Sequence, residues 1–139
     1  MSTQTKLVTG VDFVCVPTRD IDAAMKFYGE VLGIERSKMW QRAGEEPMGA
    51  EFEPGDVTVA LLACERLGIE FQANKVPIAL HVEDVEASRA ELESQGIEFA
   101  ADTLDSGVCH MAYFSDPDGN ALMLHNRYAP KDQRPNGNV

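Results

Sequence analysis

Residues 20–33 read DIDAAMKFYGEVLG, and residues 84–96 read DVEASRAELESQG. Each stretch begins with an aspartate, whose carboxylate can accept hydrogen bonds from the unpaired amides of a first helical turn. Apolar residues then recur at helical spacing, and each stretch ends at a glycine, which can adopt the left-handed conformation after a helix. The two stretches therefore predict two helices of the same design.

The separation between the two stretches changes along their length. Asp20 and Asp84 lie one residue farther apart than Gly33 and Gly96 do. A repeat whose spacing shortens in this way has lost one residue inside its second copy. We therefore expect the second helix to be one residue shorter than the first.

Strand candidates surround each helix in the same order. They are short runs rich in β-branched and apolar residues, separated by turn residues such as Pro and Gly. In the first half they lie at residues 11–16, 34–42, 49–53 and 57–62. In the second half they lie at residues 76–82, 97–103, 107–114 and 121–124. The chain therefore predicts a βαβββ unit that occurs twice.

The repeat predicts an α+β fold in which two tandem βαβββ modules form a curved mixed sheet. Helices cover the outer face, and the other face is left as an open cup, which is a natural ligand cavity. We expect one domain over residues 9–127, with modules at about 9–63 and 75–127. The stretch 63–75 is expected to be a linker, as a loop or a short helix. Residues 128–139 are expected to form a flexible tail.

Two motifs accompany the duplication. The first consists of Asp20, Phe27, Tyr28, Leu32 and Gly33, and the second is DPDGN at residues 116–120. Together they resemble the vicinal oxygen chelate superfamily, which includes glyoxalase I, bleomycin-resistance proteins, fosfomycin-resistance enzymes and extradiol dioxygenases. The resemblance implies the paired βαβββ fold and a cup for a small organic molecule. Many members form dimers, so a homodimer is expected.

The resemblance also implies where a divalent metal would bind. In metal-dependent members, His or Glu on the first and fourth strands of each module hold the ion. Counted from the motifs, those positions here are Phe13, Ala60, Pro77 and Met123. None of these side chains binds a hard divalent ion. We therefore expect no metal and no cofactor, as in the metal-free binders of the bleomycin-resistance type.

Two histidines leave other possibilities open. His81 and His125 share strand faces with the metal positions of the second module. An imidazole near neutral pH suits proton transfer, so both are candidate catalytic residues. Alternatively, the pair could form an atypical divalent metal site with a carboxylate, or the two could be ordinary polar residues of the cavity. The candidate carboxylates are Glu51, Glu53 and Asp12.

Five residues are candidates for ligand binding in the cup. Phe13 and Cys15 share one face of the first strand. Trp40 is the only tryptophan and could stack on a ligand. Arg42 could hold a carboxylate or an enolate oxygen, and Met123 offers an adaptable apolar lining. Ordinary packing is the alternative for each of them.

Composition excludes several partners. The chain has 139 residues and a formal net charge of −11. Such a charge repels phosphate backbones and anionic lipid, so neither nucleic acid nor a membrane is expected as a partner. The apolar runs of a membrane span and of a signal peptide are both missing, so we expect a cytoplasmic protein. Cys15, Cys64 and Cys109 sit among apolar residues and are expected to be buried thiols.

Three classes of function remain open. The favoured class is a metal-independent protein that holds a small organic ligand in its cup. The second is a divergent enzyme of a lyase, isomerase or dioxygenase-like type, which would use His81 and His125 for proton transfer or an atypical metal site. The third is a structural or regulatory dimer whose cup is vestigial.

Overall fold

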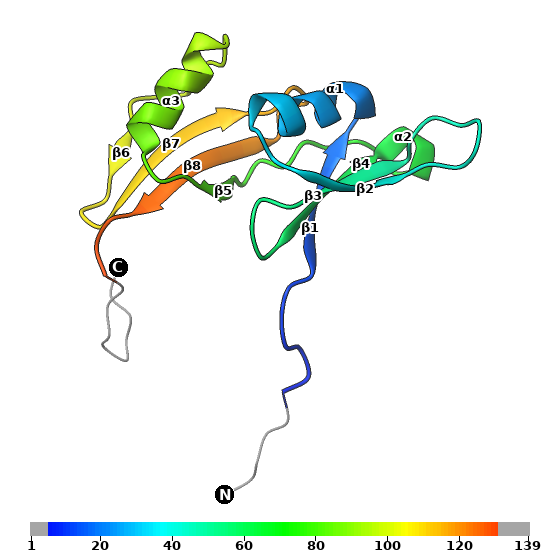
Figure 1. Ribbon diagram of the computed structural model, residues 1–139, viewed down its shortest axis with the longest axis horizontal. Helices are drawn as coiled ribbons and strands as arrows, with labels where there is room; N and C mark the ends of the chain where they lie inside the picture. Colours follow the sequence, from blue (N-terminus) through cyan, green and yellow to red (C-terminus); the bar gives the residue numbers. More distant parts are fainter. Residues whose placement is uncertain (1–5, 131–139) are drawn as a thin grey trace, which may run out of the picture. The chain divides into compact units, whose positions relative to one another are not determined.

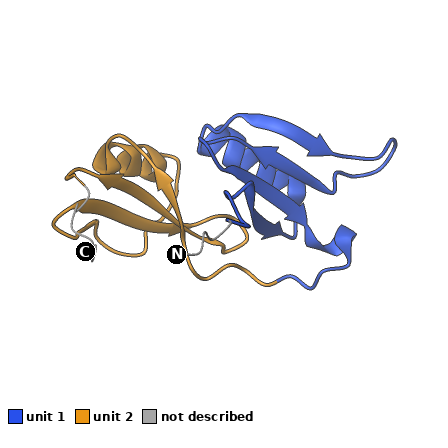
Figure 2. Ribbon diagram, turned by 90° about the horizontal axis from the view of Figure 1, so that it is seen from below, with its two compact units in different colours: residues 1–71 blue, residues 72–139 orange. Residues whose placement is uncertain are grey.

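The structure is a computed structural model that describes residues 6–130 (Figure 1). Over these residues it contains two four-stranded sheets. The chain divides into two compact units, the first ending at Phe71 and the second beginning at Gln72 (Figure 2). We refer to them as unit 1 and unit 2. None of the described helices is both long enough and apolar enough to span a bilayer.

Unit 1 is a βαβββ module followed by a short helix. Its sheet has the strand order β1-β4-β3-β2, in which β1 and β4 are parallel and the other pairs are antiparallel. The elements are β1 (Phe13–Thr18), α1 (Ile21–Lys26), the π-helical turn η1 (Phe27–Val31), β2 (Arg36–Trp40), β3 (Gly49–Phe52), β4 (Thr58–Ala63) and α2 (Cys64–Leu67).

Unit 2 repeats the same topology. Its strand order is β5-β8-β7-β6, with β5 and β8 parallel and the other pairs antiparallel. The elements are β5 (Ile78–His81), α3 (Val85–Ser94), β6 (Leu104–Asp105), β7 (Cys109–Ser115) and β8 (Ala121–Arg127). The prediction of two tandem βαβββ modules is therefore confirmed.

Both helices begin at the predicted caps. A carboxylate oxygen of Asp20 accepts from the amide of Ala23 at 3.1 Å, and one of Asp84 accepts from the amide of Ala87 at 3.0 Å. Each bond satisfies one of the amides that a helix start leaves without an intrahelical partner.

The one-residue difference between the two helices has a structural counterpart. The first helix closes with the π-helical turn η1, in which the amide of Leu32 donates to the carbonyl of Phe27, five residues back, at 2.9 Å. An α-helix bonds four residues back, so this turn accommodates one extra residue. Gly33 and Gly96 then end the two helices with positive φ angles of 71° and 90°.

Strand alternation gives each sheet two different faces. We call the face that packs against the helix the covered face, and the opposite one the open face. In unit 1, Val16, Phe52 and Leu61 point to the covered face and are at most 1% exposed. The ring of Tyr28, which is fully buried, lies 6.2 Å from that of Phe52. This contact fixes the end of the first helix on the sheet.

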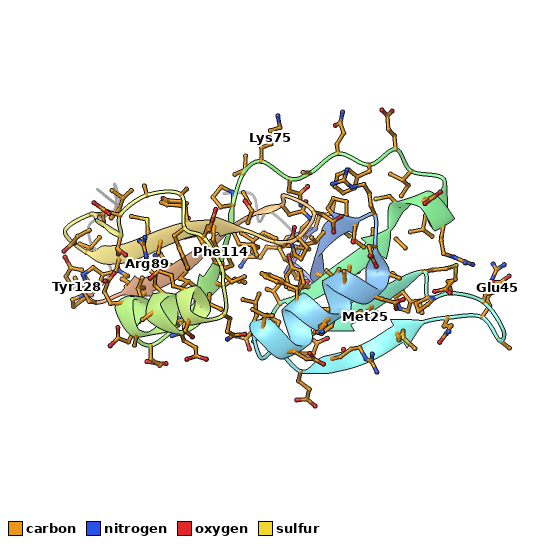
Figure 3. The ribbon with its side chains drawn as sticks, turned by 90° about the horizontal axis from the view of Figure 1, so that it is seen from above. Met25, Glu45, Lys75, Arg89, Phe114 and Tyr128 are labelled. Atoms are coloured by element: carbon orange, nitrogen blue, oxygen red, sulfur yellow. The ribbon has the colours of Figure 1, made fainter. Side chains whose placement is uncertain are left out.

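In unit 2, α3 lies across one face of β7 and β8 (Figure 1). The residues buried on this covered face include Ala112, Phe114, Leu122 and Leu124. Figure 3 labels Phe114 and, on α3, Arg89. The guanidinium of Arg89 lies 4.8 Å from the ring of Phe99, whose centroid is 5.1 Å from that of Phe114.

The ring contacts of Phe99 explain why the strand predicted in this region does not form. Residues 97–103 were expected to be a strand, but they form a loop, and the strand β6 follows it. Phe99 packs against Phe114 inside the unit, and the loop's amide of Ala100 donates to the carbonyl of Tyr113. Packing of the side chain, rather than a continuous ladder, holds this segment.

The DPDGN motif forms a turn with a dense hydrogen-bond network. One carboxylate oxygen of Asp116 accepts from the amides of Asp118 and Asn120, both at 2.9 Å, and the other accepts from the side-chain nitrogen of Asn120 at 2.9 Å. The side-chain oxygen of Asn120 accepts from the amide of Asn74 at 2.8 Å. The motif therefore joins the start of unit 2 to the turn between β7 and β8.

The cysteines, the C-terminal segment and the domain boundaries were also predicted from the sequence. Cys64 and Cys109 are buried as expected, but Cys15 is exposed, because alternation along β1 turns it to the open face. The predicted tail begins with an anchored residue, since the hydroxyl of Tyr128 donates to Asp105 at 2.7 Å. Residues 131–139 of that tail lie outside the described part of the chain. The single-domain boundaries at 9 and 127 stay a prediction.

Candidate functional site

The open face of unit 1 carries Phe13 and Cys15 of β1. They alternate with Val14, Val16 and Thr18, which turn toward the covered face. The side chain of Phe13 is 51% exposed, which is a large apolar surface for a strand residue. The structure thus brings these two ligand-binding candidates to one face.

Trp40 lies on the same open face, at the end of β2. It is in register with Gly49 of β3. A Cβ atom added to Gly49 would lie 2.5 Å from Cε3 of the Trp40 ring and 2.6 Å from the carbonyl oxygen of Leu61. The indole therefore lies directly over the glycine, where any side chain would displace it.

A hydrogen bond fixes the indole from its other edge. Nε1 of Trp40 donates to Oε2 of Glu51 at 2.9 Å. Glu51 is in register with Ala60 of β4, which is in register with Cys15. Among residues 6–130, Oε1 of Glu51 has no hydrogen-bond partner. Trp40 and Glu51 thus form a rigid aromatic surface with an acceptor beside it, and we call this pair with Gly49 the Trp40 platform.

A second carboxylate lies close to the platform, just after β3. Glu53 accepts from the hydroxyl of Ser37 at 2.5 Å and from that of Thr58 at 2.6 Å. The bond from Ser37, followed by that from Thr58, lowers the pKa of the Glu53 carboxyl below its ordinary value. Hydrogen bonds to the charged form favour it, so this group stays negative to lower pH.

The structure does not bring Arg42 to this face. The strand was expected to reach residue 42, but β2 ends at Trp40. Arg42 is exposed in the following loop, where its carbonyl accepts from the amide of Glu45 at 3.0 Å. Figure 3 shows Glu45 at the tip of this loop. Because the strand ends two residues earlier than expected, strand alternation does not place the Arg42 side chain on the open face.

The open face of unit 2 carries Met123 and both candidate histidines. His125 is in register with His81 across the parallel pair β5 and β8, and with Met111 across the antiparallel pair β7 and β8. Nε2 of His81 lies 3.3 Å from a carboxylate oxygen of Glu83. The structure therefore places the two histidines in register on neighbouring strands, and a carboxylate lies within reach of His81.

The four positions implied for divalent-metal ligands lie on the expected strands or directly beside them. Phe13, Ala60 and Met123 lie on the open faces of their units, and Pro77 comes just before β5. None of the four offers an oxygen or nitrogen side-chain donor, so they do not fit a hard divalent ion. Within the described part of the chain, no group of three or more His, Cys, Asp or Glu side chains is placed to hold a metal.

Sequence reasoning missed one cluster in unit 2, which centres on Asp105. Nε2 of His110 lies 3.4 Å from its carboxylate, the hydroxyl of Tyr128 donates to it, and the His110 and Tyr128 rings lie 4.7 Å apart. A surface pocket of about 440 Å³ adjoins the cluster; its lining is Glu86, Arg89, Asp102, Thr103, Asp105 and His110. No motif in the sequence connects these residues, and Tyr128 was assigned to the tail.

The Asp105 cluster makes a testable prediction about ionisation. The amide of Gly107, followed by the hydroxyl of Tyr128, lowers the pKa of Asp105, and the same contact raises the pKa of Tyr128. A lowered carboxyl pKa stabilises the fold above the unfolded-state pKa, and this contribution is lost as pH falls through the folded-state pKa. Tyr128→Phe should therefore raise the Asp105 pKa toward its ordinary value, as measured by carbon-detected NMR titration.

Tyr113→Phe is the matched control, because the hydroxyl of Tyr113 lies on the other face and donates to Met111. This variant should leave the Asp105 pKa unchanged. If Tyr128→Phe and Tyr113→Phe give the same Asp105 titration curve as the wild type, the assigned contact is wrong.

The paired modules, the capped helices and the DPDGN turn define a class of protein. The family model of the Glyoxalase/Bleomycin resistance protein/Dioxygenase superfamily matches residues 10–124, and the chain belongs to this superfamily. The superfamily resemblance inferred from the motifs is therefore confirmed. A search of curated protein sequences finds no match to the chain.

Solved structures share the fold. The chain is similar to TnmS3, an antibiotic binding protein from Streptomyces sp. CB03234, with TM-score 0.72, 22% identity, and coverage of 88% of this chain and 99% of that one. It is also similar to a glyoxalase/bleomycin resistance protein/dioxygenase from Nocardioides, with TM-score 0.71, 22% identity and coverage of 94% and 91%. A lactoylglutathione lyase from Agrobacterium tumefaciens gives TM-score 0.66, 19% identity and coverage of 86% and 95%.

Proposed function

We propose that this chain is a small-molecule binding protein that holds a planar aromatic ligand against the Trp40 platform, without a metal. The observation that carries the proposal is the fixed indole, which lies over Gly49 and is hydrogen-bonded to Glu51. A ring held in place before binding costs less conformational entropy when a ligand stacks on it. Exposed Phe13 on β1 adds apolar surface to the same open face.

The charges near the platform favour a ligand that carries a cation or a hydrogen-bond donor. Oε1 of Glu51 can accept such a donor beside the indole. Glu53 stays ionised to lower pH than an ordinary glutamate, and the chain has a formal net charge of −11. Attraction between these carboxylates and a cationic ring adds to stacking, whereas an anionic ring is repelled.

Two further observations support the proposal. The positions implied for metal ligands are occupied by Phe13, Ala60, Pro77 and Met123, which lack hard donors. A structural neighbour, TnmS3, is described as an antibiotic binding protein. A homodimer and a cytoplasmic location remain predictions.

The test uses three planar probes of different charge: proflavine, which is cationic, anthracene-9-methanol, which is neutral, and anilinonaphthalene sulfonate, which is anionic. Trp40 is the only tryptophan, so its emission reports directly on the platform. We expect saturable quenching, with proflavine bound most tightly. Quenching by the probes that does not saturate, and that is equally strong for Trp40 and for free indole in solution, would contradict binding at this face.

Trp40→Ala provides the quantitative prediction. Aromatic stacking contributes about 1–3 kcal/mol, so this variant should bind proflavine roughly tenfold more weakly or worse. Binding is followed by the anisotropy of proflavine, because the variant has no tryptophan. Trp40→Phe retains a ring and should lose less affinity. Unchanged affinity in Trp40→Ala would exclude the platform as the binding surface.

The enzymatic alternative is distinguished by the fate of the ligand. A sequestering protein returns its ligand chemically unchanged, as measured by mass spectrometry. Conversion of the ligand that is lost in His81→Ala or His125→Ala, with the fold intact, would favour the lyase or isomerase alternative instead.

A further inference from the structure

A cavity of about 400 Å³ lies on the covered side of the unit 1 sheet. Its lining comes from the first helix with its turn η1 and from the strands β2 and β3. Figure 3 labels one of the lining residues, Met25, on the helix. We call the cavity the Arg36 pocket; its lining residues are Met25, Lys26, Gly29, Glu30, Arg36 and Phe52.

Apolar and charged side chains lie at different depths in the Arg36 pocket. Phe52 is 1% exposed and Met25 is half-buried, so these two form the floor. The side chains of Lys26, Glu30 and Arg36 are exposed and form the rim. An apolar floor with a few charged groups above it matches a small molecule that has an apolar tail and a charged head group.

An irregularity in β2 brings Arg36 to this pocket. Arg36 is in register with Phe52, and Lys38 is in register with the residue next to Phe52, so β2 has one extra residue here. In a regular strand, Arg36 and Met39 would point to opposite faces, because they are three positions apart. The extra residue brings both side chains to the covered face, as a β-bulge does.

The guanidinium of Arg36 contacts only weak acceptors. Its Nη1 donates to the sulfur of Met25 at 3.7 Å and to that of Met39 at 4.0 Å. A thioether is a weak acceptor, whereas a guanidinium carries several strong N–H donors. Over residues 6–130, no carboxylate forms an ion pair with Arg36. Its donors are therefore available to a ligand carboxylate, which a guanidinium can bind through a pair of parallel hydrogen bonds.

The rim of the pocket is positive in a chain that is negative as a whole. Lys26 and Arg36 outnumber the carboxylate of Glu30, although the formal net charge of the chain is −11. Salt screens exposed charges that lie farther apart than about 8–10 Å, so a ligand in the pocket responds mainly to the charges of the rim. A negative head group is therefore the one that fits.

Gly29 leaves the pocket open where a side chain would enter it. Gly29 lies in η1, and its φ is outside the left-handed region that favours glycine. A Cβ atom added there would lie 3.4 Å from the ring of Phe52, which is an ordinary van der Waals distance. Neither the backbone nor the packing requires a glycine at this position, although glycine is a poor helix former. The open volume of the pocket gives the missing side chain a physical reason.

We propose that the Arg36 pocket binds a small carboxylate with an apolar tail, of the medium-chain fatty acid type. The guanidinium of Arg36 binds the carboxylate, and the ammonium of Lys26 adds a second positive charge. The tail lies against Met25 and Phe52, since a thioether side chain adapts to irregular apolar shapes. The pocket is on the covered face and the Trp40 platform is on the open face, so failure of either proposal leaves the other unaffected.

The test uses three probes with the same alkyl chain and different head groups: octanoate, which is anionic, 1-octanol, which is neutral, and octylammonium, which is cationic. Calorimetric titration of the full chain measures affinity, and the NMR shift of the Gly29 amide places the binding at this pocket. We expect saturable binding, with octanoate bound at least about tenfold more tightly than the other two. Added salt should weaken the binding of octanoate but not that of 1-octanol.

Three charge variants test the rim. Arg36→Gln should weaken octanoate binding by about tenfold, because it removes the charged donors. Arg66→Gln is the matched control: it removes an arginine of the same unit that pairs with Glu45 outside the pocket, so octanoate affinity should stay unchanged. Glu30→Gln should tighten octanoate binding roughly twofold or more, because it removes a repelling charge.

Gly29→Leu tests the floor. The new side chain should occupy the volume of the tail and abolish octanoate binding, while the helix stays folded by circular dichroism because leucine is a strong helix former. Should this variant fail to fold, Gly29→Ala adds one methyl group at an ordinary contact distance and should still weaken octanoate binding.

Three results would overturn the proposal. The first is octanoate that does not bind the wild type, or binds no more tightly than 1-octanol. The second is equal octanoate affinity in Arg36→Gln and Arg66→Gln. The third is octanoate affinity that is unchanged when residue 29 carries a side chain in a folded variant.

Discussion

Gly49→Ala is expected to destabilise unit 1 by about 3 kcal/mol, at the upper end of the range for inserting a methyl group into packed structure. The new Cβ would lie 2.5 Å from the Trp40 ring and 2.6 Å from the backbone carbonyl oxygen of Leu61. The ring can rotate away, but the carbonyl belongs to the central strand β4 and cannot. Urea denaturation followed by circular dichroism measures the loss.

Gly55→Ala is the matched control, because a Cβ there meets no atom within 4 Å. Its stability should stay within about 0.5 kcal/mol of the wild type. In the double variant Gly49→Ala/Trp40→Ala, the clash with the ring is removed, but the new Cβ still clashes with the carbonyl oxygen of Leu61. Rescue should therefore be partial, and full rescue would show that the backbone had room after all.

Asp116→Ala is expected to destabilise unit 2 by about 3 kcal/mol or more. The carboxylate is 6% exposed and accepts three hydrogen bonds, two from backbone amides and one from Asn120. Bonds to a charged acceptor contribute about 1.5–3 kcal/mol each, and buried amides left without a partner add a desolvation cost. The melting temperature should fall by roughly 10 °C, measured by calorimetry.

Asp56→Ala gives the comparison, because Asp56 is exposed in the corresponding turn of unit 1. It should change the stability by no more than about 0.5 kcal/mol. Equal losses in the two variants would mean that the acidic charge, and not the buried network, stabilises these turns.

The sequence predicts the topology well because the repeat carries it at several levels. The caps Asp20 and Asp84, the stops Gly33 and Gly96, and the alternation along the strands all agree with one βαβββ unit. Local propensity, spacing and turn chemistry point to the same structure, which is why the prediction survives errors at individual strand ends.

The candidate site is predicted in part. Strand parity correctly groups Phe13 with Cys15, and it places His81 and His125 on one face. It fails for Arg42, because a strand end that moves by two residues removes the alternation on which the argument depends. Strand ends depend on turn geometry, which the spacing of apolar residues does not encode.

Contacts between distant side chains are the part that the sequence leaves out. The bond from Trp40 to Glu51 requires the register of β2 against β3, including the irregularity between Arg36 and Lys38. The Asp105 cluster requires that Tyr128 fold back from beyond β8. Neither pairing follows a fixed spacing, so only the structure shows them.

The π-helical turn η1 bears on how the two halves diverged. It places the one-residue difference inside the first helix rather than in a connecting loop, so an alignment of the two halves needs its gap between Phe27 and Val31. The strands on either side keep equivalent positions in both units, with the one-residue difference absorbed locally. Deleting one residue within this turn would restore an ordinary α-helix, which makes the helix end a tolerant point for insertions and deletions in an otherwise length-constrained module.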